Sequence, residues 1–204
     1  LLTPERIRRD TTEALAALHP DVGVLAASGH LLPQHLLDAF PHGVLNVHAS
    51  LLPRHRGASP VAAAILAGDA EAGASIMRIV RELDAGPVLA RVTTPIEPLD
   101  TAGTLTDRIA DLGAHAMLDT LPRWIRGEVA AVPQDEAGAT YAPGTEQPLP
   151  PPTPEQPFSI CLQASANPSP PAPATPSTIA AVLPALRGFF GGLMDAEPAS
   201  AGGC

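Results

Sequence analysis

Two kinds of apolar pattern alternate along the first 142 residues. Short continuous apolar runs at 22–28 and 43–49 are typical of strands buried on both faces, as in a parallel sheet. Segments with helical spacing lie beside them, at 11–20, 33–40 and 59–68. Strands that alternate with helices in this way predict an α/β fold.

A strand pair and a long helix are predicted next. Residues 74–82 and 87–96 have strand-like patterns, and the short turn Leu-Asp-Ala-Gly lies between them, so we expect them to pair. Residues 103–127 predict an amphipathic helix. Its apolar stripe comprises Leu105, Ile109, Leu112, Ala116 and Leu121. Thr104 and Asp107 resemble a capping box near its start.

The chain changes character near Gly144. "APGTEQPLPPPTPEQP" and "NPSPPAPATPS" are proline-rich and contain few of the large apolar side chains that offset chain entropy. We therefore divide the chain into an α/β domain, residues 1–143, and a low-complexity tail, residues 144–204. Residues 143–177 are expected to be extended or disordered. A shift of reading frame near Gly144 is one hypothesis for the change.

A membrane segment is not predicted. The longest apolar run, residues 178–194, contains Pro184, Arg187 and three glycines. It is also shorter than the roughly 20 apolar residues that span a bilayer as a helix.

Composition limits the kind of core, the kind of ligand and the cellular location that we expect. Apolar residues make up 45% of the chain but aromatic residues only 3%, so the core must consist mainly of Ala, Leu, Val and Ile. A net charge of -9 argues against a generic nucleic-acid surface, although it allows one local basic patch. The two cysteines, Cys161 and Cys204, provide neither a disulfide framework nor a metal-binding spacing. We expect a reducing, cytoplasmic location and no metal site.

Candidate chemistry is concentrated in "LNVHASLLPRHRG", residues 45–57. Asn46 and His48 share one face of an extended segment, at its end. Asp84 follows later, at a junction of strand and turn. Taken singly, these residues have structural explanations, since a lone histidine is usually a hydrogen-bonded core residue and an aspartate before Ala-Gly usually forms a turn.

Taken together, the same residues resemble a known signature. Asn-x-His-x-Ser-Leu-Leu-Pro, followed by Asp-x-Gly after a strand, is similar to the pattern of the formyltransferases that use 10-formyltetrahydrofolate. "LLPRHRGASPV", "LAGDAEAGASIM" and "PQDEAGATYAP" look like segments of those members that formylate initiator methionyl-tRNA. The resemblance extends from Leu2 to Pro143 and implies a Rossmann-like domain, with a parallel-type sheet flanked by helices.

The resemblance also implies roles for the site residues. Asn46 and His48 would stabilise the formyl oxygen as it gains negative charge, and His48 could also act as a general acid. Asp84 would orient His48 and help to remove a proton from the attacking amine. The reaction needs no metal.

Two further sets of residues follow from the same resemblance. The loop Ser50, Leu51, Leu52 and Pro53 would bind folate, because an apolar turn with free backbone groups suits a flat pterin. Tight packing of the loop against the sheet is the alternative for Leu51 and Leu52. Arg54 and Arg56 would contact tRNA phosphates, or would simply be solvated.

The chain also departs from the family pattern. The resemblance implies a strand–helix–strand unit before residue 1 and a small barrel after residue 143, and neither pattern is present in these 204 residues. We therefore expect an incomplete domain in which the strand at 22–27 has an unpaired edge. His55 replaces an aromatic residue of the family loop.

Several functions stay open on this basis. The leading expectation is a formyl transfer to methionyl-tRNA by a cytoplasmic, monomeric enzyme. One alternative is a related enzyme that formylates a small amine, such as a nucleotide sugar or glycinamide ribonucleotide, and another is a hydrolase of formyl-folate. An inactive fragment, or a binding module whose proline-rich tail docks into aromatic grooves, is the non-enzymatic alternative.

Overall fold

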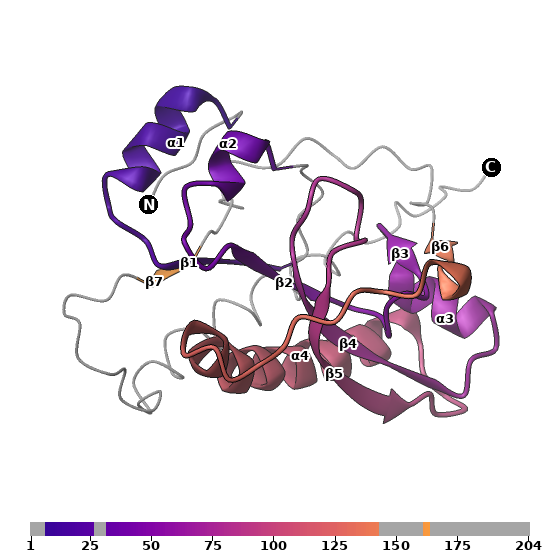
Figure 1. Cartoon of the computed structure of the whole chain (residues 1–204). Coiled ribbons are helices and arrows are strands. Elements are labelled where there is room, and N and C mark those ends of the chain that lie inside the picture. The colour runs from indigo at the N-terminus through magenta and orange to yellow at the C-terminus, as the bar shows by residue number, and fades with distance from the viewer. Residues whose placement is uncertain (1–6, 27–31, 143–160, 164–204) are drawn as a thin grey trace, which may run out of the picture.

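The computed structural model describes residues 7–26, 32–142 and 161–163 (Figure 1). In chain order its elements are α1 (Arg9–Ala16), β1 (Val22–Ala26), α2 (Gln34–Leu37), β2 (Val44–His48), β3 (Arg56–Gly57), α3 (Pro60–Leu66), β4 (Glu71–Arg78), β5 (Val88–Pro95), α4 (Ala102–Ile125), the 3-10 helix η1 (Glu136–Gly138), β6 (Tyr141–Ala142) and β7 (Cys161–Gln163). The α/β class predicted from the apolar patterns is confirmed.

The main sheet is mixed rather than parallel. Its strand order is β5-β4-β2-β1-β7, and only β1 and β2 are parallel, whereas β4 runs antiparallel to both β2 and β5. A parallel pair needs a crossover of a dozen or more residues, which the segment containing α2 supplies between β1 and β2. β4 and β5 form a hairpin, as predicted, but β4 ends at Arg78 rather than at residue 82, so residues 79–87 connect the two strands. The chain returns from β2 into β4 at the same end of the sheet, so β4 runs antiparallel to β2. In this pairing His48, the last residue of β2, lies opposite Ser75.

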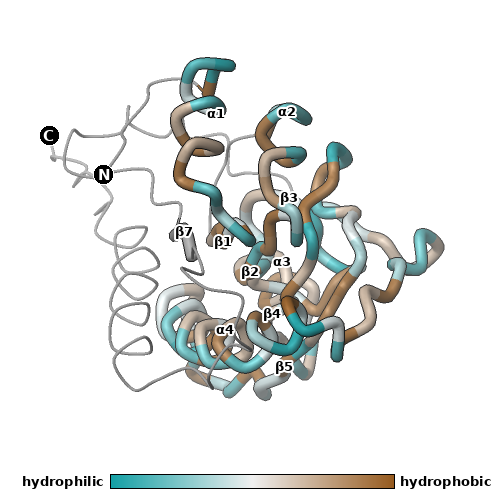
Figure 2. Tube along the Cα trace, turned by 60° about the vertical axis from the view of Figure 1, so that its left-hand side comes forward, coloured by the Kyte–Doolittle hydropathy of each residue, from teal (hydrophilic) through white to brown (hydrophobic). Residues whose placement is uncertain are grey.

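Helices cover the two faces of the sheet (Figures 1 and 2). One core cluster joins β1, β2 and β4 to α3 and α4, and a second joins the opposite face to α1 and α2. Both consist mainly of Ala, Leu, Val and Ile, as the low aromatic content predicts, with Phe40 in the second cluster. Strand alternation divides the residues between the clusters, since Leu45 faces α4 while Val44 faces α2.

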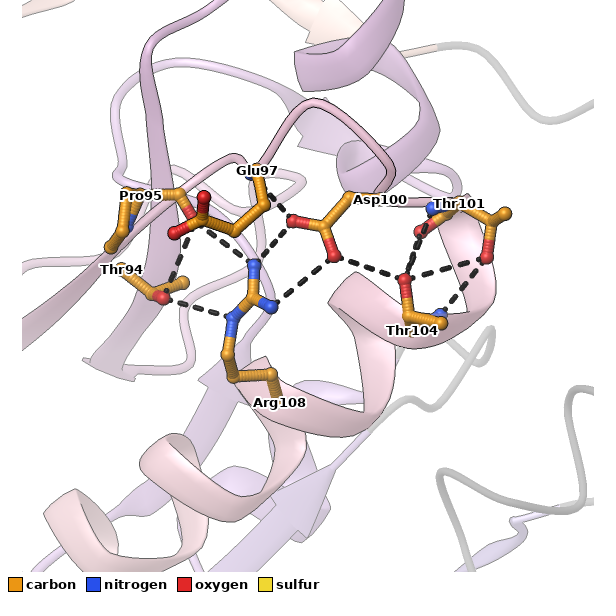
Figure 3. A network of polar contacts seen from close by, with 7 residues as sticks. All are labelled: Thr94, Pro95, Glu97, Asp100, Thr101, Thr104 and Arg108. Atoms are coloured by element: carbon orange, nitrogen blue, oxygen red, sulfur yellow. Dashed lines mark hydrogen bonds and ion pairs between the residues drawn. The ribbon is translucent and has the colours of Figure 1, made fainter.

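The long helix α4 begins earlier than predicted. Its N-cap is Thr101, whose side chain accepts a hydrogen bond from the Thr104 backbone N–H, while the Thr104 hydroxyl accepts from the Thr101 N–H (Figure 3). The predicted pair of Thr104 and Asp107 is therefore wrong as a capping box, because the helix continues through Gly103. Of the predicted stripe, Leu105, Ile109 and Leu121 are buried, and Leu112 and Ala116 are half-buried.

The outer edge of β1 is paired. β7 runs antiparallel to β1, with Gly23 opposite Leu162, so the prediction of an unpaired edge is wrong for this structure. The rest of the predicted tail, including the apolar run at 178–194, lies outside the described residues. Within the described parts of the chain, no helix has the length and apolar character of a membrane span.

Candidate active site

The carboxyl end of β2 presents two polar side chains on one face. Leu45 and Val47 point into the core beneath α4, and alternation turns Asn46 and His48 to the other face. Only 7% of the surface of His48 is exposed to solvent, and Asn46 is half-buried. The shared face predicted for this pair is therefore confirmed.

Both ring nitrogens of His48 face polar groups, and Nε2 makes a hydrogen bond. Its Nε2 lies 3.0 Å from the backbone oxygen of His55, and its Nδ1 lies 3.8 Å from Oδ1 of Asp84. Because a carbonyl oxygen can only accept, Nε2 must carry the hydrogen of this bond. Nδ1 is therefore the ring nitrogen that faces Asp84, and a proton on Nδ1 would lie beside a carboxylate.

Asp84 is fixed from two sides of the turn that carries it. It adopts a left-handed backbone conformation, with φ of 48°. Its Oδ2 accepts a hydrogen bond of 2.8 Å from the Gly57 N–H, and its own carbonyl accepts one of 2.7 Å from Nε2 of Gln134. The remaining oxygen, Oδ1, is the one that faces His48.

Gly57 can hold Asp84 because it lacks a side chain. Its φ is 110°, and a Cβ at this position would lie 2.5 Å from the backbone oxygen of Ala142. The close approach of β3 to β6 therefore requires glycine at this position. The N–H groups of Arg56 and Ala58 donate to carbonyls of β6 and of the residue before it, and the Gly57 N–H between them donates to Asp84.

Asn46 carries a buried acceptor without a partner. Among the side-chain nitrogen and oxygen atoms of the described residues, its Oδ1 is the one that is buried and makes no hydrogen bond. Buried polar atoms are nearly always paired, so an orphan beside His48 points to a group that arrives with a ligand. Half a turn of the amide exchanges Oδ1 and Nδ2, and Asn46 can thus offer either an acceptor or a donor.

The backbone of the loop 50–53 is largely occupied, which corrects the expectation of free backbone groups. Ser75 on β4 donates from its hydroxyl to the Ser50 carbonyl at 2.7 Å and accepts from the Leu52 N–H at 3.1 Å. The Leu52 carbonyl accepts from Nε of Arg91 at 2.9 Å. The Pro53 carbonyl accepts from the Thr140 N–H at 3.3 Å. The loop is therefore a rigid platform on β4 rather than an open set of donors and acceptors.

The side chains of this loop also differ in how far they are exposed to solvent. Leu52 is 1% exposed and packs with Met77 and Val88, so for Leu52 the structure matches the alternative of packing against the sheet. Leu51 and Pro53 are half-buried and keep part of their surface available. Ser50 is buried, and its hydroxyl donates to the Arg54 carbonyl at 2.7 Å.

The two arginines predicted to contact tRNA or solvent have different environments. Arg54 is half exposed and pairs with Asp69 at 2.6 Å. Burial alone would raise the pKa of Asp69, but the hydrogen bond from His55 and the charge of Arg54 outweigh it, and the pKa lies below its usual value. Arg54 is thus compatible with a surface contact.

Arg56 is neither solvated nor available to a phosphate, which corrects the prediction. It is 1% exposed. Its guanidinium donates to Oε1 of Gln134, to both carboxylate oxygens of Glu136 and to the hydroxyl of Tyr141. These contacts use its donor groups in full, and the hydrogen bond to Glu136 is the main cause that raises the pKa of Arg56. The same bond lowers the pKa of Glu136.

The segment 134–142 contacts several parts of the site and holds them in place. Through Gln134 it reaches Arg56 and the turn of Asp84, and through β6 it pairs with β3. In the sequence this segment stands out only by its resemblance, and the supporting roles of Gln134, Glu136, Thr140 and Ser75 are not predictable. The partners of these side chains lie far away along the chain, and local patterns do not report them.

These groups suit chemistry at a carbonyl. An amide and a histidine on one face, with a carboxylate beside the histidine, can stabilise an oxyanion and move a proton. Among the described residues, no group of three or more His, Cys, Asp or Glu side chains is placed to hold a metal ion.

Comparison with known proteins places this site in a family context. A family model described as formyl transferase matches residues 2–121. The chain is 50% identical over 142 residues to the methionyl-tRNA formyltransferase of Gluconobacter oxydans, which covers 69% of this chain and 45% of that protein. The chain thus spans less than half the length of this curated relative.

Solved structures agree on the fold. Glycinamide ribonucleotide transformylase 1 from Symbiobacterium toebii aligns with a TM-score of 0.57 at 26% identity, over 60% of this chain and 61% of that one. HypX from Aquifex aeolicus, solved in complex with tetrahydrofolic acid, aligns with a TM-score of 0.59 at 25% identity, over 69% of this chain and 24% of that one. The matched residues contain Asn46, His48 and Asp84, and the chain belongs to the formyl transferase family.

Proposed function

We propose that this chain carries the centre that transfers a formyl group from 10-formyltetrahydrofolate to the amino group of initiator methionyl-tRNA. The observation that carries the proposal is the placement of Asp84 against Nδ1 of His48, beside the orphan amide of Asn46, in a chain 50% identical to a methionyl-tRNA formyltransferase. The proposal includes a cytoplasmic location, since the acceptor is a tRNA, and takes the chain to be a monomer.

The reaction is an attack of an amine nitrogen on the formyl carbon. The carbonyl electron pair moves to the formyl oxygen, and the bond from carbon to N10 of the folate then breaks. The amine loses one proton and N10 gains one, so a formamide and tetrahydrofolate are the products. The charge that builds up on the formyl oxygen is the feature that the site must stabilise.

Asn46 and His48 supply that stabilisation. The amide of Asn46 can turn its NH2 toward the formyl oxygen, and Nδ1 of His48, the ring nitrogen left to face the site, can donate when the ring is in its imidazolium form. A preorganised donor of this kind typically lowers the barrier by about 3–4 kcal/mol. Such a donor is most effective where water is excluded, and His48 is buried.

Asp84 supports the positive form of His48 and assists proton removal. Its Oδ1 faces Nδ1, and its Oδ2 is held by the Gly57 N–H, so the carboxylate keeps one oxygen for the site. A carboxylate in this position stabilises an imidazolium and can take up the proton of the attacking amine, directly or through a water.

The loop 50–53 is proposed to hold the folate. Ser75 and Arg91 fix its backbone, which makes the loop a preorganised surface, with Leu51 and Pro53 still partly accessible. Preorganisation of this kind reduces the entropy lost on binding. Arg54 is the residue of the pair that remains a candidate contact for tRNA.

Methionyl-tRNA is favoured as acceptor over a small amine. The chain shares 43–50% identity with relatives described as methionyl-tRNA formyltransferases. Its identity to the solved transformylase of glycinamide ribonucleotide is 26%. The difference favours the tRNA substrate within one shared fold.

The proposal is tested by supplying the purified chain with 10-formyltetrahydrofolate and methionyl-tRNA, and measuring formylmethionyl-tRNA and tetrahydrofolate. We expect both products in equal amounts, and their loss in His48→Asn and Asp84→Asn variants that still unfold cooperatively. Tetrahydrofolate without a formylated acceptor would indicate a hydrolase instead. Formylation of an amino sugar nucleotide in preference to the tRNA would also contradict the proposal, as would a folded chain that binds no folate.

A further inference from the structure

His55 is fixed at three points although its backbone conformation is unfavourable. Its φ is 57°, in the left-handed region, and its side chain is buried. Its N–H donates to the Thr140 hydroxyl at 2.9 Å, and its ring Nε2 lies 2.7 Å from Oδ2 of Asp69. Its carbonyl accepts the hydrogen bond from Nε2 of His48 at 3.0 Å.

The ring contact is the anchor of this arrangement. A histidine in the left-handed region persists only where its surroundings hold it. Asp69 is itself confined, since Arg54 contacts its other oxygen at 2.6 Å and only 14% of its side chain is exposed. The carboxylate therefore has a fixed place, and the ring of His55 is attached to it.

The ring contact and the pairing of β3 with β6 together fix the direction of the His55 carbonyl. The peptide group that follows His55 is held by its Arg56 N–H, which donates to the Thr140 carbonyl at 2.8 Å. The His55 N–H on Thr140 and the ring on Asp69 hold the residue on the other side of this peptide group, which therefore has little freedom to rotate. Its oxygen is the acceptor that keeps a hydrogen on Nε2 of His48. Without a fixed acceptor, a neutral imidazole distributes its hydrogen between both nitrogens.

We propose that His55 is a positioning residue: its ring, anchored on Asp69, aims the His55 carbonyl at Nε2 of His48 and so keeps Nδ1 of His48 turned to Asp84. The role rests on the function proposed for His48. The tautomer of His48, which the proposal predicts, does not depend on that function and can be measured without any substrate.

The test uses long-range ¹H–¹⁵N correlation spectra of the ¹⁵N-labelled full chain at alkaline pH. The signals of His48 are assigned by their loss in a His48→Gln variant. In the unaltered chain we expect one pyrrole-type nitrogen, Nε2, and one pyridine-type nitrogen, Nδ1. In His55→Phe, which keeps a ring but lacks the donor to Asp69, we expect the two signals to move toward an average.

Two matched variants separate the anchor from general loosening. His55→Gln retains a donor of similar reach and should restore the separated signals. Asp119→Asn weakens an exposed ion pair with Arg123 on α4, does not touch Asp69, and should leave the signals unchanged. If His55→Phe fails to fold, Asp69→Asn decides, because it weakens the acceptor with little change of shape and should produce partial averaging.

Activity provides the second readout. Outer partners that fix a histidine tautomer at metal sites are typically worth about 10–100-fold, and a loss of that order is expected in His55→Phe, with recovery in His55→Gln. Unchanged His48 signals in folded His55→Phe and Asp69→Asn would overturn the inference. If the His48 signals average in His55→Phe but the unaltered chain transfers no formyl group, the positioning role of His55 stands and only the proposed function is contradicted.

Discussion

Arg56 donates from both Nε and a terminal nitrogen to the single side-chain oxygen of Gln134, at 3.1 and 2.9 Å. The amide nitrogen of Gln134 in turn donates to the carbonyls of Asp84 and Gly86, at 2.7 Å each. One amide thus connects a buried arginine to the turn that presents the proposed catalytic carboxylate. The segment 134–142 supports the turn of Asp84 mainly through Gln134.

Gln134→Ala should therefore reduce both stability and activity. It leaves the buried Gly86 carbonyl and part of the Arg56 guanidinium without partners, and each such group costs about 1–3 kcal/mol. The turn of Asp84 also loses one of its two supports. Urea unfolding and single-turnover formyl transfer measure the two effects. The control is Gln34→Ala, where an exposed contact with Asp38 is lost and we expect a change within about 0.5 kcal/mol. Equal stability of the two variants would contradict this view of Gln134.

The local parts of this site were predictable from the sequence. The period of two along a strand places Asn46 and His48 on one face wherever the strand pairs. The stretch Leu-Asp-Ala-Gly between two strand-like patterns predicts both the hairpin and the place of Asp84 in the connection between its strands. These inferences depend on neighbours in the chain, which a sequence displays directly.

The contacts between distant residues were not predictable in the same way. A charged side chain is rarely buried without a partner, so exposure was the natural expectation for Arg56. Its partners, Gln134 and Glu136, lie on a segment with no periodic pattern. The orientation of β4 against β2 likewise depends on the path of the chain between them, which local propensity does not encode.

Gly57→Ala should be more damaging than an equivalent change elsewhere. Its new Cβ would lie 2.5 Å from the Ala142 oxygen, at a backbone φ of 110°. Strain and overlap together predict a loss of about 2–5 kcal/mol, together with displacement of the N–H that holds Asp84. The matched control is Gly127→Ala, where φ is 71° but no atom lies within 4 Å of the new Cβ.

For Gly127→Ala we expect only the backbone cost, about 1 kcal/mol, and unchanged formyl transfer. Thermal and urea unfolding compare the two variants directly. A Gly57→Ala chain as stable and active as Gly127→Ala would show that β3 and β6 do not approach as closely as described.

Asp100 should make stability depend on pH in acid. Its hydrogen bond from Arg108 is the main cause that lowers its pKa from the usual 3.8 to about 2, and the Glu97 N–H and Thr104 hydroxyl add to the effect (Figure 3). A lowered carboxyl pKa stabilises the fold fully above its unfolded value, and this contribution is lost as the pH falls from about 4 to about 2.

The measurement is urea unfolding of the chain and of Asp100→Asn between neutral pH and pH of about 2. The difference in unfolding free energy between them should shrink as the pH falls through that window. Asp119→Asn serves as control, since the contact of Asp119 with Arg123 is exposed and should contribute little at any pH. A difference that is constant with pH would rule out Asp100 as the titrating group.

Asn46→Ala should separate activity from stability. The Oδ1 of Asn46 has no partner among the described residues, so its removal breaks no hydrogen bond of that atom and also removes the penalty of a buried orphan. We expect formyl transfer to fall by about 100- to 1,000-fold, the usual loss of one oxyanion donor, while the free energy of unfolding stays within about 1 kcal/mol. The neighbouring Leu45→Ala gives the converse, because Leu45 is fully buried in the core beneath α4 and its truncation costs about 2–5 kcal/mol. A large loss of stability in Asn46→Ala, with activity retained, would mean that Asn46 is a structural residue and that the formyl oxygen is stabilised by other groups.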